Sequence, residues 1–78
     1  MKIEVLGAGC PKCKLLESAV RKAVLEEKVN AEIIKVTELD QIIGKGVMMT
    51  PALIIDGKIK STGKIPSIEE IKKWIKLS

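Results

Sequence analysis

Short apolar segments of two different periods alternate along this chain, and their order constrains the fold more than any other feature. We expect four strands and three helices. The strands are predicted at 3–6, 31–36, 52–55 and 58–61, and the helices at 11–28, 39–43 and 67–77. The first two strands flank a helix and should be parallel, whereas Asp56-Gly57 favours a tight hairpin between the last two. The sequence therefore predicts an α/β fold of order β-α-β-α-β-β-α, a mixed four-stranded sheet with helices on both faces.

Helix starts and apolar faces support this order. Pro11 suits the first position of the first helix, and Ser67 with Glu70 forms a capping box before the last one. Thr37 and Asp40 resemble a capping pair for the short middle helix. The predicted apolar stripes contain Leu15, Leu16, Ala19, Val20, Ala23 and Val24 in the first helix and Ile68, Ile71, Trp74 and Ile75, with Ser78 at the edge, in the last.

Composition limits the classes of protein that fit. The 78 residues suit one domain, residues 1–78, with an aliphatic core, because Trp74 is the only aromatic residue. Apolar runs are too short to span a membrane, and the chain begins like a strand, so we expect a cytoplasmic protein. Lysines account for the net charge of +4; without aromatic platforms, nucleic-acid binding is not expected. One Asn and one Gln beside many Lys, Glu and Ile suggest a thermophilic source.

The strongest functional signal is Cys10-Pro11-Lys12-Cys13, between the first strand and the first helix. Unpaired backbone N–H groups at a helix start favour a thiolate, so the pKa of Cys10 should fall below that of a free thiol. Lys12 and Lys14 add positive charge nearby. Cys13, inside the first turn, should be more buried and close enough to attack a mixed disulfide.

The sequence resembles the thioredoxin and glutaredoxin superfamily, and it is most similar to the small archaeal and bacterial thioredoxin-like redox-active disulfide proteins. The resemblance covers the whole chain and rests on Gly9 with the cysteine motif, on Thr50-Pro51 and on Asp56-Gly57. It implies a minimal thioredoxin fold in which Pro51 is a cis-proline beside the cysteines and Thr50 pairs with a substrate strand. Pro11, Lys12 and Met49 would also contact substrate. Gly9 stands where thioredoxins have tryptophan, and Lys12 where typical glutaredoxins have tyrosine, so the glutathione-binding signature is incomplete.

The resemblance implies a thiol–disulfide oxidoreductase. Cys10 would be the nucleophile and Cys13 the resolving residue, acting on disulfide-containing proteins and re-reduced by a dithiol or a flavoprotein reductase. No cofactor or metal is required, and we expect a monomer.

A copper or zinc carrier that uses the same two sulfurs is an alternative, with Met48 and Met49 as soft ligands for copper. A closed zinc site needs four ligands, but the chain has two cysteines and no histidine. Copper chaperones with this motif end on a strand, whereas this chain ends on a predicted helix. A redox-sensing binding module is a third interpretation.

Glu4 is the candidate proton acceptor for Cys13. Thioredoxins carry a buried aspartate at the same spacing before the cysteines, and it handles the proton of the buried cysteine. A Glu4 buried without a cationic partner would have a raised pKa; the alternative is an exposed strand residue. Met48 and Met49 similarly have two interpretations, as a substrate surface or as core residues beside the site.

Overall fold

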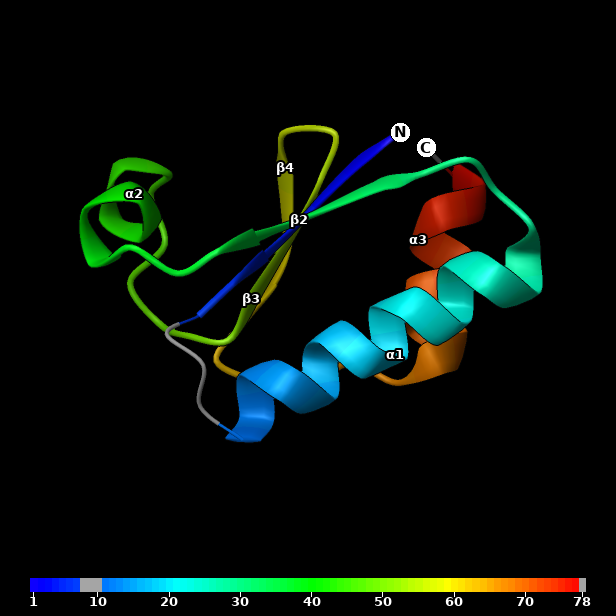
Figure 1. Cartoon of the computed structure of the whole chain (residues 1–78), viewed down its shortest axis with the longest axis horizontal. Helices are drawn as coiled ribbons and strands as arrows, with labels where there is room; N and C mark the ends of the chain where they lie inside the picture. The colour runs from blue at the N-terminus through cyan, green and yellow to red at the C-terminus, as the bar shows by residue number, and fades with distance from the viewer. Residues whose placement is uncertain (8–10, 78) are drawn as a thin grey trace.

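The computed structural model describes residues 1–7 and 11–77, and these residues form the predicted sequence of elements. Figure 1 shows their arrangement. Their bounds are β1 (Lys2–Leu6), α1 (Pro11–Glu27), β2 (Glu32–Val36), α2 (Leu39–Gly44), β3 (Ala52–Ile55), β4 (Lys58–Thr62) and α3 (Ile68–Leu77). The predicted order β-α-β-α-β-β-α is confirmed, and each predicted bound lies within one residue of the observed one.

The strands of the described residues lie in one mixed sheet, in the order β2-β1-β3-β4. β1 pairs with β2 in parallel and with β3 in antiparallel orientation, and β3 pairs antiparallel with β4. The β3–β4 turn has positive φ at both Asp56 (50°) and Gly57 (82°), which is the backbone geometry predicted for this dipeptide. β1 is thus an inner strand, and in the sequence the cysteine motif begins four residues after its last residue, Leu6.

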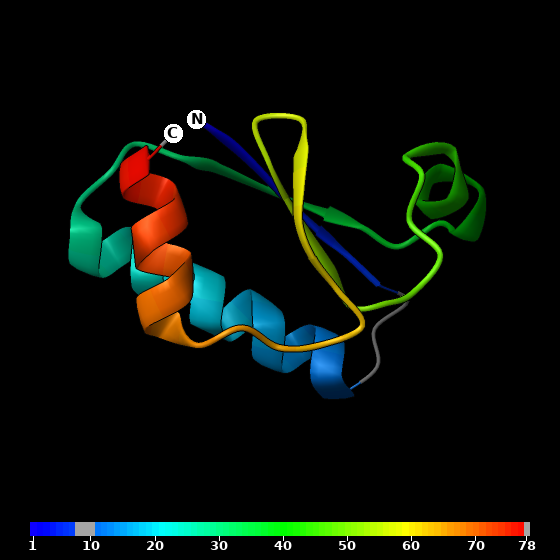
Figure 2. The same ribbon diagram turned by 180° about the vertical axis from the view of Figure 1, so that it is seen from behind.

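The two faces of the sheet are covered by different helices (Figures 1 and 2). α1 and α3 pack together on one face, and α2 lies at the other. Because side chains alternate along a strand, β1 contributes to both layers. The core on the α1/α3 face contains Ile3, Val5, Leu16, Val20, Ala23, Leu53, Ile55, Ile71 and Ile75. The smaller core on the α2 face contains Leu6, Val36, Ile42, Val47, Ala52 and Ile54.

Two local predictions need correction. The N-cap of α2 is Glu38, with no hydrogen bond from a capping side chain, so the predicted Thr37–Asp40 pair is wrong. Leu15 was predicted on the buried stripe of α1, but its side chain is 59% exposed. The capping box of α3 is confirmed: the Glu70 N–H donates to Ser67 Oγ (3.1 Å), and the Ser67 N–H donates to Glu70 Oε1 (3.3 Å).

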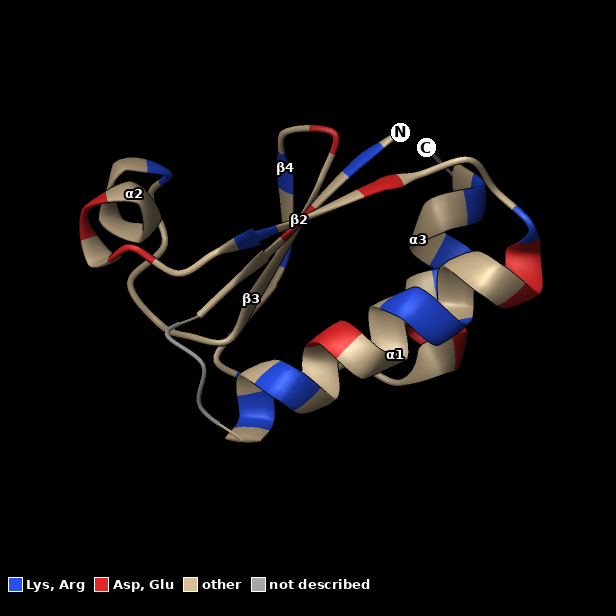
Figure 3. Ribbon diagram, in the orientation of Figure 1, with Lys and Arg blue, Asp and Glu red and all other residues tan. Residues whose placement is uncertain are grey.

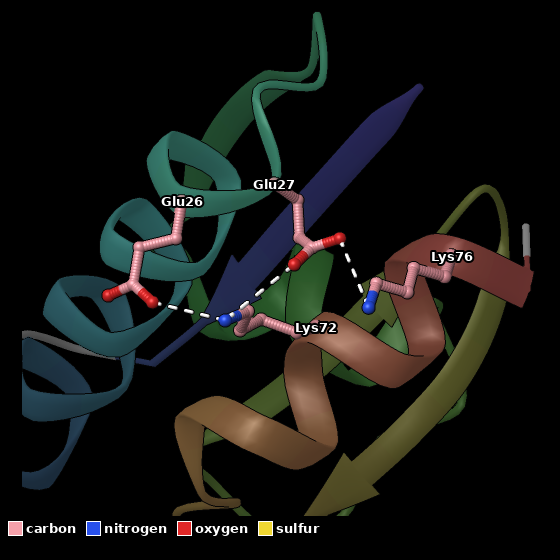
Figure 4. Close-up of polar contacts among 4 residues, drawn as sticks. All are labelled: Glu26, Glu27, Lys72 and Lys76. Atoms are coloured by element: carbon pink, nitrogen blue, oxygen red, sulfur yellow. Dashed lines mark hydrogen bonds and ion pairs between the residues drawn. The ribbon is translucent and has the colours of Figure 1, made fainter.

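Lysines of α3 pair with carboxylates at the end of α1 (Figure 4). Lys72 Nζ lies 3.1 Å from Glu26 Oε1 and 3.6 Å from Glu27 Oε2, and Lys76 Nζ lies 3.5 Å from Glu27 Oε1. The hydrogen bond to Glu26 is the main reason why the pKa of Lys72 is raised. Figure 3 shows both signs of charge along α1. These lysines therefore join two helices rather than forming a basic face for an anionic partner.

Candidate active site

Cys13 lies in the first turn of α1, is only 6% exposed and is held in a disulfide. The sequence contains one other cysteine, Cys10, so an intramolecular disulfide can join only this pair. Cys10 itself, predicted to be the nucleophile, lies outside the described residues. The expected burial of Cys13 is confirmed, and its sulfur is part of an oxidised pair in this structure.

Gly7 lies close to both Cys13 and Pro51. Its N–H donates to the Val36 carbonyl (2.9 Å), which extends the β1–β2 ladder by one residue. A Cβ added to Gly7 would overlap Cys13 Sγ and would lie 4.0 Å from the Cα of Pro51. Because only glycine leaves this space for the sulfur, Gly7 allows α1 to approach the end of β1 closely. Gly7 is not among the site residues predicted from the sequence, although a glycine directly after a strand and three residues before Cys10 was the available signal.

Pro51 follows a cis peptide bond, as the resemblance implied, and its side chain is buried. Its carbonyl accepts a hydrogen bond from the Gly63 N–H (2.8 Å), which ties this position to the residues after β4. Thr50, Pro11 and Lys12 are exposed. The predicted substrate-contacting residues therefore present accessible surface around a buried Cys13 and Pro51; their contacts with substrate stay predictions.

Met48 and Met49 both lie at the surface, so the interpretation of either as a core residue is wrong. Met48 is 97% and Met49 62% exposed. Met49 packs over Gly63, where an added Cβ would come within 2.8 Å of its terminal methyl group. Next to Thr50, a groove of about 310 Å³ is lined by Leu39, Ile42, Ile43, Val47 and Met48. Apolar side chains thus remain exposed immediately beside the candidate site.

Glu4 is buried, but on the opposite face of the sheet from Cys13. It pairs across the sheet with Ile54 of the α2-side core, whereas the neighbouring Val5 faces α1. Its carboxylate lies 3.3 Å from Lys2 Nζ and 3.1 Å from Lys45 Nζ. Burial alone would raise its pKa, but the hydrogen bonds and charges of Lys45 and Lys2 outweigh burial, and the pKa is lowered. The raised pKa expected for an unpaired Glu4 is therefore incorrect, and this geometry does not support a proton transfer between Glu4 and Cys13.

A second carboxylate lies on the same side as the sulfur. Glu17 is one helical turn after Cys13, and both line a cavity of about 30 Å³ together with Lys35, Lys14, Val5 and Gly7. Glu17 Oε2 accepts a hydrogen bond from Arg21 Nε (2.9 Å), and Glu17 Oε1 lies 3.3 Å from Lys35 Nζ. These two cations hold the pKa of Glu17 below its usual value. Glu17 is not among the site residues predicted from the sequence, because it lies off the apolar stripe; its i+4 spacing from Cys13 was the available signal.

Among residues 1–7 and 11–77, no three His, Cys, Asp or Glu side chains come together as a metal site would need. Within the same ranges, no helix combines the length and the apolar character that crossing a membrane requires.

Comparison with known proteins gives a consistent family. The family model of the thioredoxin domain matches residues 1–76. A thioredoxin of Methanothermobacter thermautotrophicus is 45% identical over 73 residues, which cover 94% of this chain and 95% of the relative. A thioredoxin of Methanocaldococcus jannaschii is 46% identical over 74 residues, which cover 95% and 85% of the two chains. Both relatives come from thermophilic archaea, in agreement with the source suggested by composition.

Proposed function

This chain belongs to the thioredoxin family and is a thioredoxin-like redox protein, and we propose that it exchanges disulfides with protein substrates through Cys10 and Cys13. One observation carries the proposal. The sulfur of Cys13 is oxidised in a disulfide, buried in the first turn of α1 and packed against Gly7 beside Pro51. A disulfide that closes so short a loop contributes little chain entropy to stability, so a redox role explains the pair better than a structural one.

The proposed reaction has two steps. The Cys10 thiolate attacks a substrate disulfide, so that a mixed disulfide forms and one substrate sulfur leaves as a thiolate. Cys13 then loses its proton and attacks the Cys10 sulfur, which releases the second substrate thiolate and forms the Cys10–Cys13 disulfide. Cys10 directly precedes α1 in the sequence, so the backbone N–H groups of that helix start, together with Lys12 and Lys14, favour its thiolate. A dithiol or a flavoprotein reductase would return the pair to the reduced form.

We expect the substrate to be an extended segment of a disulfide-containing protein. Thr50 is exposed beside the buried Pro51, and Pro11, Lys12 and Met49 offer further accessible surface. Sulfur chemistry alone balances the reaction, so the proposal requires no cofactor or metal. We further propose that the chain is a cytoplasmic monomer made of one domain, residues 1–78.

An insulin-reduction assay with dithiothreitol, run on a sample whose copper and zinc contents are measured, tests the proposal. We expect turnover above the rate with dithiothreitol alone, with no stoichiometric metal. Lys73→Gln is a control for the loss of one positive charge, because Lys73 is an exposed lysine on α3. This variant should keep the wild-type rate. Absence of turnover, together with tight binding of one metal ion per chain or per pair of chains, would favour the metal carrier instead.

A further inference from the structure

The cavity between α1 and the carboxyl ends of β1 and β2 brings the buried sulfur of Cys13 together with a charged pair that the family resemblance did not indicate. Cys13 and Glu17 line it from consecutive turns of α1, and Lys35 lines it from β2. Val5 of β1 is the register partner of Lys35 in β2 and faces α1, so the sheet presents Lys35 to the same side as Cys13. We propose that the Glu17 carboxylate, positioned by Lys35, accepts the proton of the Cys13 thiol when Cys13 attacks the mixed disulfide. This inference rests on the proposed function.

The side chain of Glu17 is held in one place. Each carboxylate oxygen has its own cationic partner, Oε2 with Arg21 and Oε1 with Lys35. Only 18% of the Glu17 side chain is exposed, whereas the side chains of Arg21 and Lys35 are each 55% exposed. The carboxylate is therefore partly shielded from solvent, whereas about half of the side chain of each partner is exposed.

The size of the cavity suits a relay through water. About 30 Å³ is enough for one water molecule, which needs two to four polar partners. The Cys13 thiol, the Glu17 carboxylate and the Lys35 ammonium can supply them. A proton can thus pass from sulfur to carboxylate without direct contact between the two side chains.

The charges around the cavity suit an acceptor that is ready at neutral pH. Among the described residues, the charged groups that face it are Lys14 and Glu17 from α1 and Lys35 from β2, with Arg21 bonded to Glu17. From β1 the cavity receives Val5, and from just after β1 it receives Gly7; both are uncharged. The cations keep Glu17 a carboxylate and lower its pKa, which also makes it a weaker base, so Glu17 can hold the proton only transiently. Lys14 and Lys35 also stabilise the thiolate that forms.

The step is balanced in atoms and charge. The S–H proton of Cys13 goes to Glu17, the new Cys10–Cys13 bond forms, and the bond between Cys10 and the substrate sulfur breaks. The substrate sulfur leaves with the electron pair as a thiolate. Glu17 then returns the proton to solvent or to that thiolate. The proposed roles of the two cysteines are unchanged, and only the destination of the Cys13 proton is assigned.

A two-phase reaction with 5,5′-dithiobis(2-nitrobenzoate) tests the assignment. When a limiting amount of this disulfide is mixed rapidly with the reduced chain, attack by Cys10 releases the first thionitrobenzoate and attack by Cys13 releases the second. In Glu17→Gln, we expect the second phase to be slower by about tenfold at neutral pH, which is below the usual range of general-base effects. The two rates should converge above the free-thiol pKa of about 8.5, where solvent can remove the proton. The first phase should be unchanged.

Glu27→Gln is the matched control. Glu27 lies on the same helix, its side chain is 15% exposed, and it also pairs with two cations, Lys72 and Lys76. It should lose comparable ion pairs without any change in the second phase. Glu17→Asp keeps a carboxylate and should restore part of the rate at neutral pH.

Three results would overturn the assignment. They are an unchanged second phase in Glu17→Gln, a slowing by the same factor at every pH, and a slowing at neutral pH that appears in Glu4→Gln instead. In each of these cases the wild-type chain still exchanges disulfides, so the proposed function would stand. A wild-type chain that gives no second phase at all would remove the proposed function, and this inference with it.

Discussion

The two faces of the sheet differ in how completely helices cover them. On the α1/α3 face, two long helices pack against the strands and are joined to each other by ion pairs. On the α2 face, one short helix covers a smaller core and leaves Leu39 and Ile43 more than 60% exposed. The larger face therefore supplies most of the buried apolar surface and also holds Cys13. The smaller face leaves apolar surface accessible beside Thr50.

The same comparison separates the two carboxylates of interest. Glu4 and Glu17 each pair with two basic side chains, and the pKa of each is lowered. They differ in position, because Glu4 lies on the α2 face and Glu17 lines the cavity that contains Cys13. Burial and charge alone would not distinguish them as partners of the sulfur, but the alternation of side chains along β1 does.

Truncation of the two cores should reveal the largest difference between the faces. Leu16 of α1 is fully buried among the helices and strands of the larger core, whereas Ile42 of α2 belongs to the smaller one. We expect Leu16→Ala to lower the free energy of unfolding by about 3–5 kcal/mol and Ile42→Ala by about 2 kcal/mol, within the range for such truncations. Urea melts of both variants at neutral pH measure this. Equal losses would show that the two cores contribute alike.

Gly7→Ala should have an intermediate effect confined to the active-site end of the sheet. The added methyl group would overlap Cys13 Sγ, so α1 or β1 must shift. We expect a loss of about 1–3 kcal/mol, as for other overpacked positions, and slower insulin reduction. Gly44→Ala is a useful control, because nothing lies within 4 Å of a Cβ added there. Wild-type stability in Gly7→Ala would contradict the close approach of the helix to the strand.

Glu4→Gln should give the smallest effect, and its sign depends on pH. The folded-state pKa of Glu4 lies below the reference value of 4.5, so its ion pairs add stability above that value. This contribution is lost as pH falls through the folded-state pKa. The variant should therefore be destabilised by about 1 kcal/mol at neutral pH, near the upper end for ion pairs with exposed partners, and should match wild type in strong acid. Denaturant melts at both pH values would detect this, and a variant more stable than wild type at neutral pH would contradict it.

Local signals were sufficient for much of this molecule. Asp56-Gly57 predicted the hairpin, Ser67 with Glu70 predicted the start of α3, and the position of Cys13 inside the first turn of a predicted helix predicted its burial. Each of these depends on neighbours within a few residues. The cis bond before Pro51 came from the family resemblance, because the local sequence does not determine it.

Other features depend on contacts between distant segments. The pairing of Glu17 with Lys35 follows from the packing of α1 on β2, which no spacing in the sequence reveals. The cations around Glu4 similarly include Lys45, which follows α2. Leu15 fits the helical apolar pattern, but at the first turns of α1 no element covers it among the described residues. Periodicity identifies a candidate face, whereas tertiary packing determines how much of it is buried.

Trapping of a mixed disulfide distinguishes the attacking cysteine, Cys10, from the resolving cysteine, Cys13. Reduced Cys13→Ser and Cys10→Ser variants are each incubated with a disulfide-containing protein such as insulin, and the adducts are quantified by non-reducing mass spectrometry. We expect Cys13→Ser to accumulate a stable adduct at Cys10, because the buried partner that would release it is gone. Cys10→Ser should accumulate little, since Cys13 is only 6% exposed. Equal trapping by both variants, or trapping only by Cys10→Ser, would contradict the assigned roles.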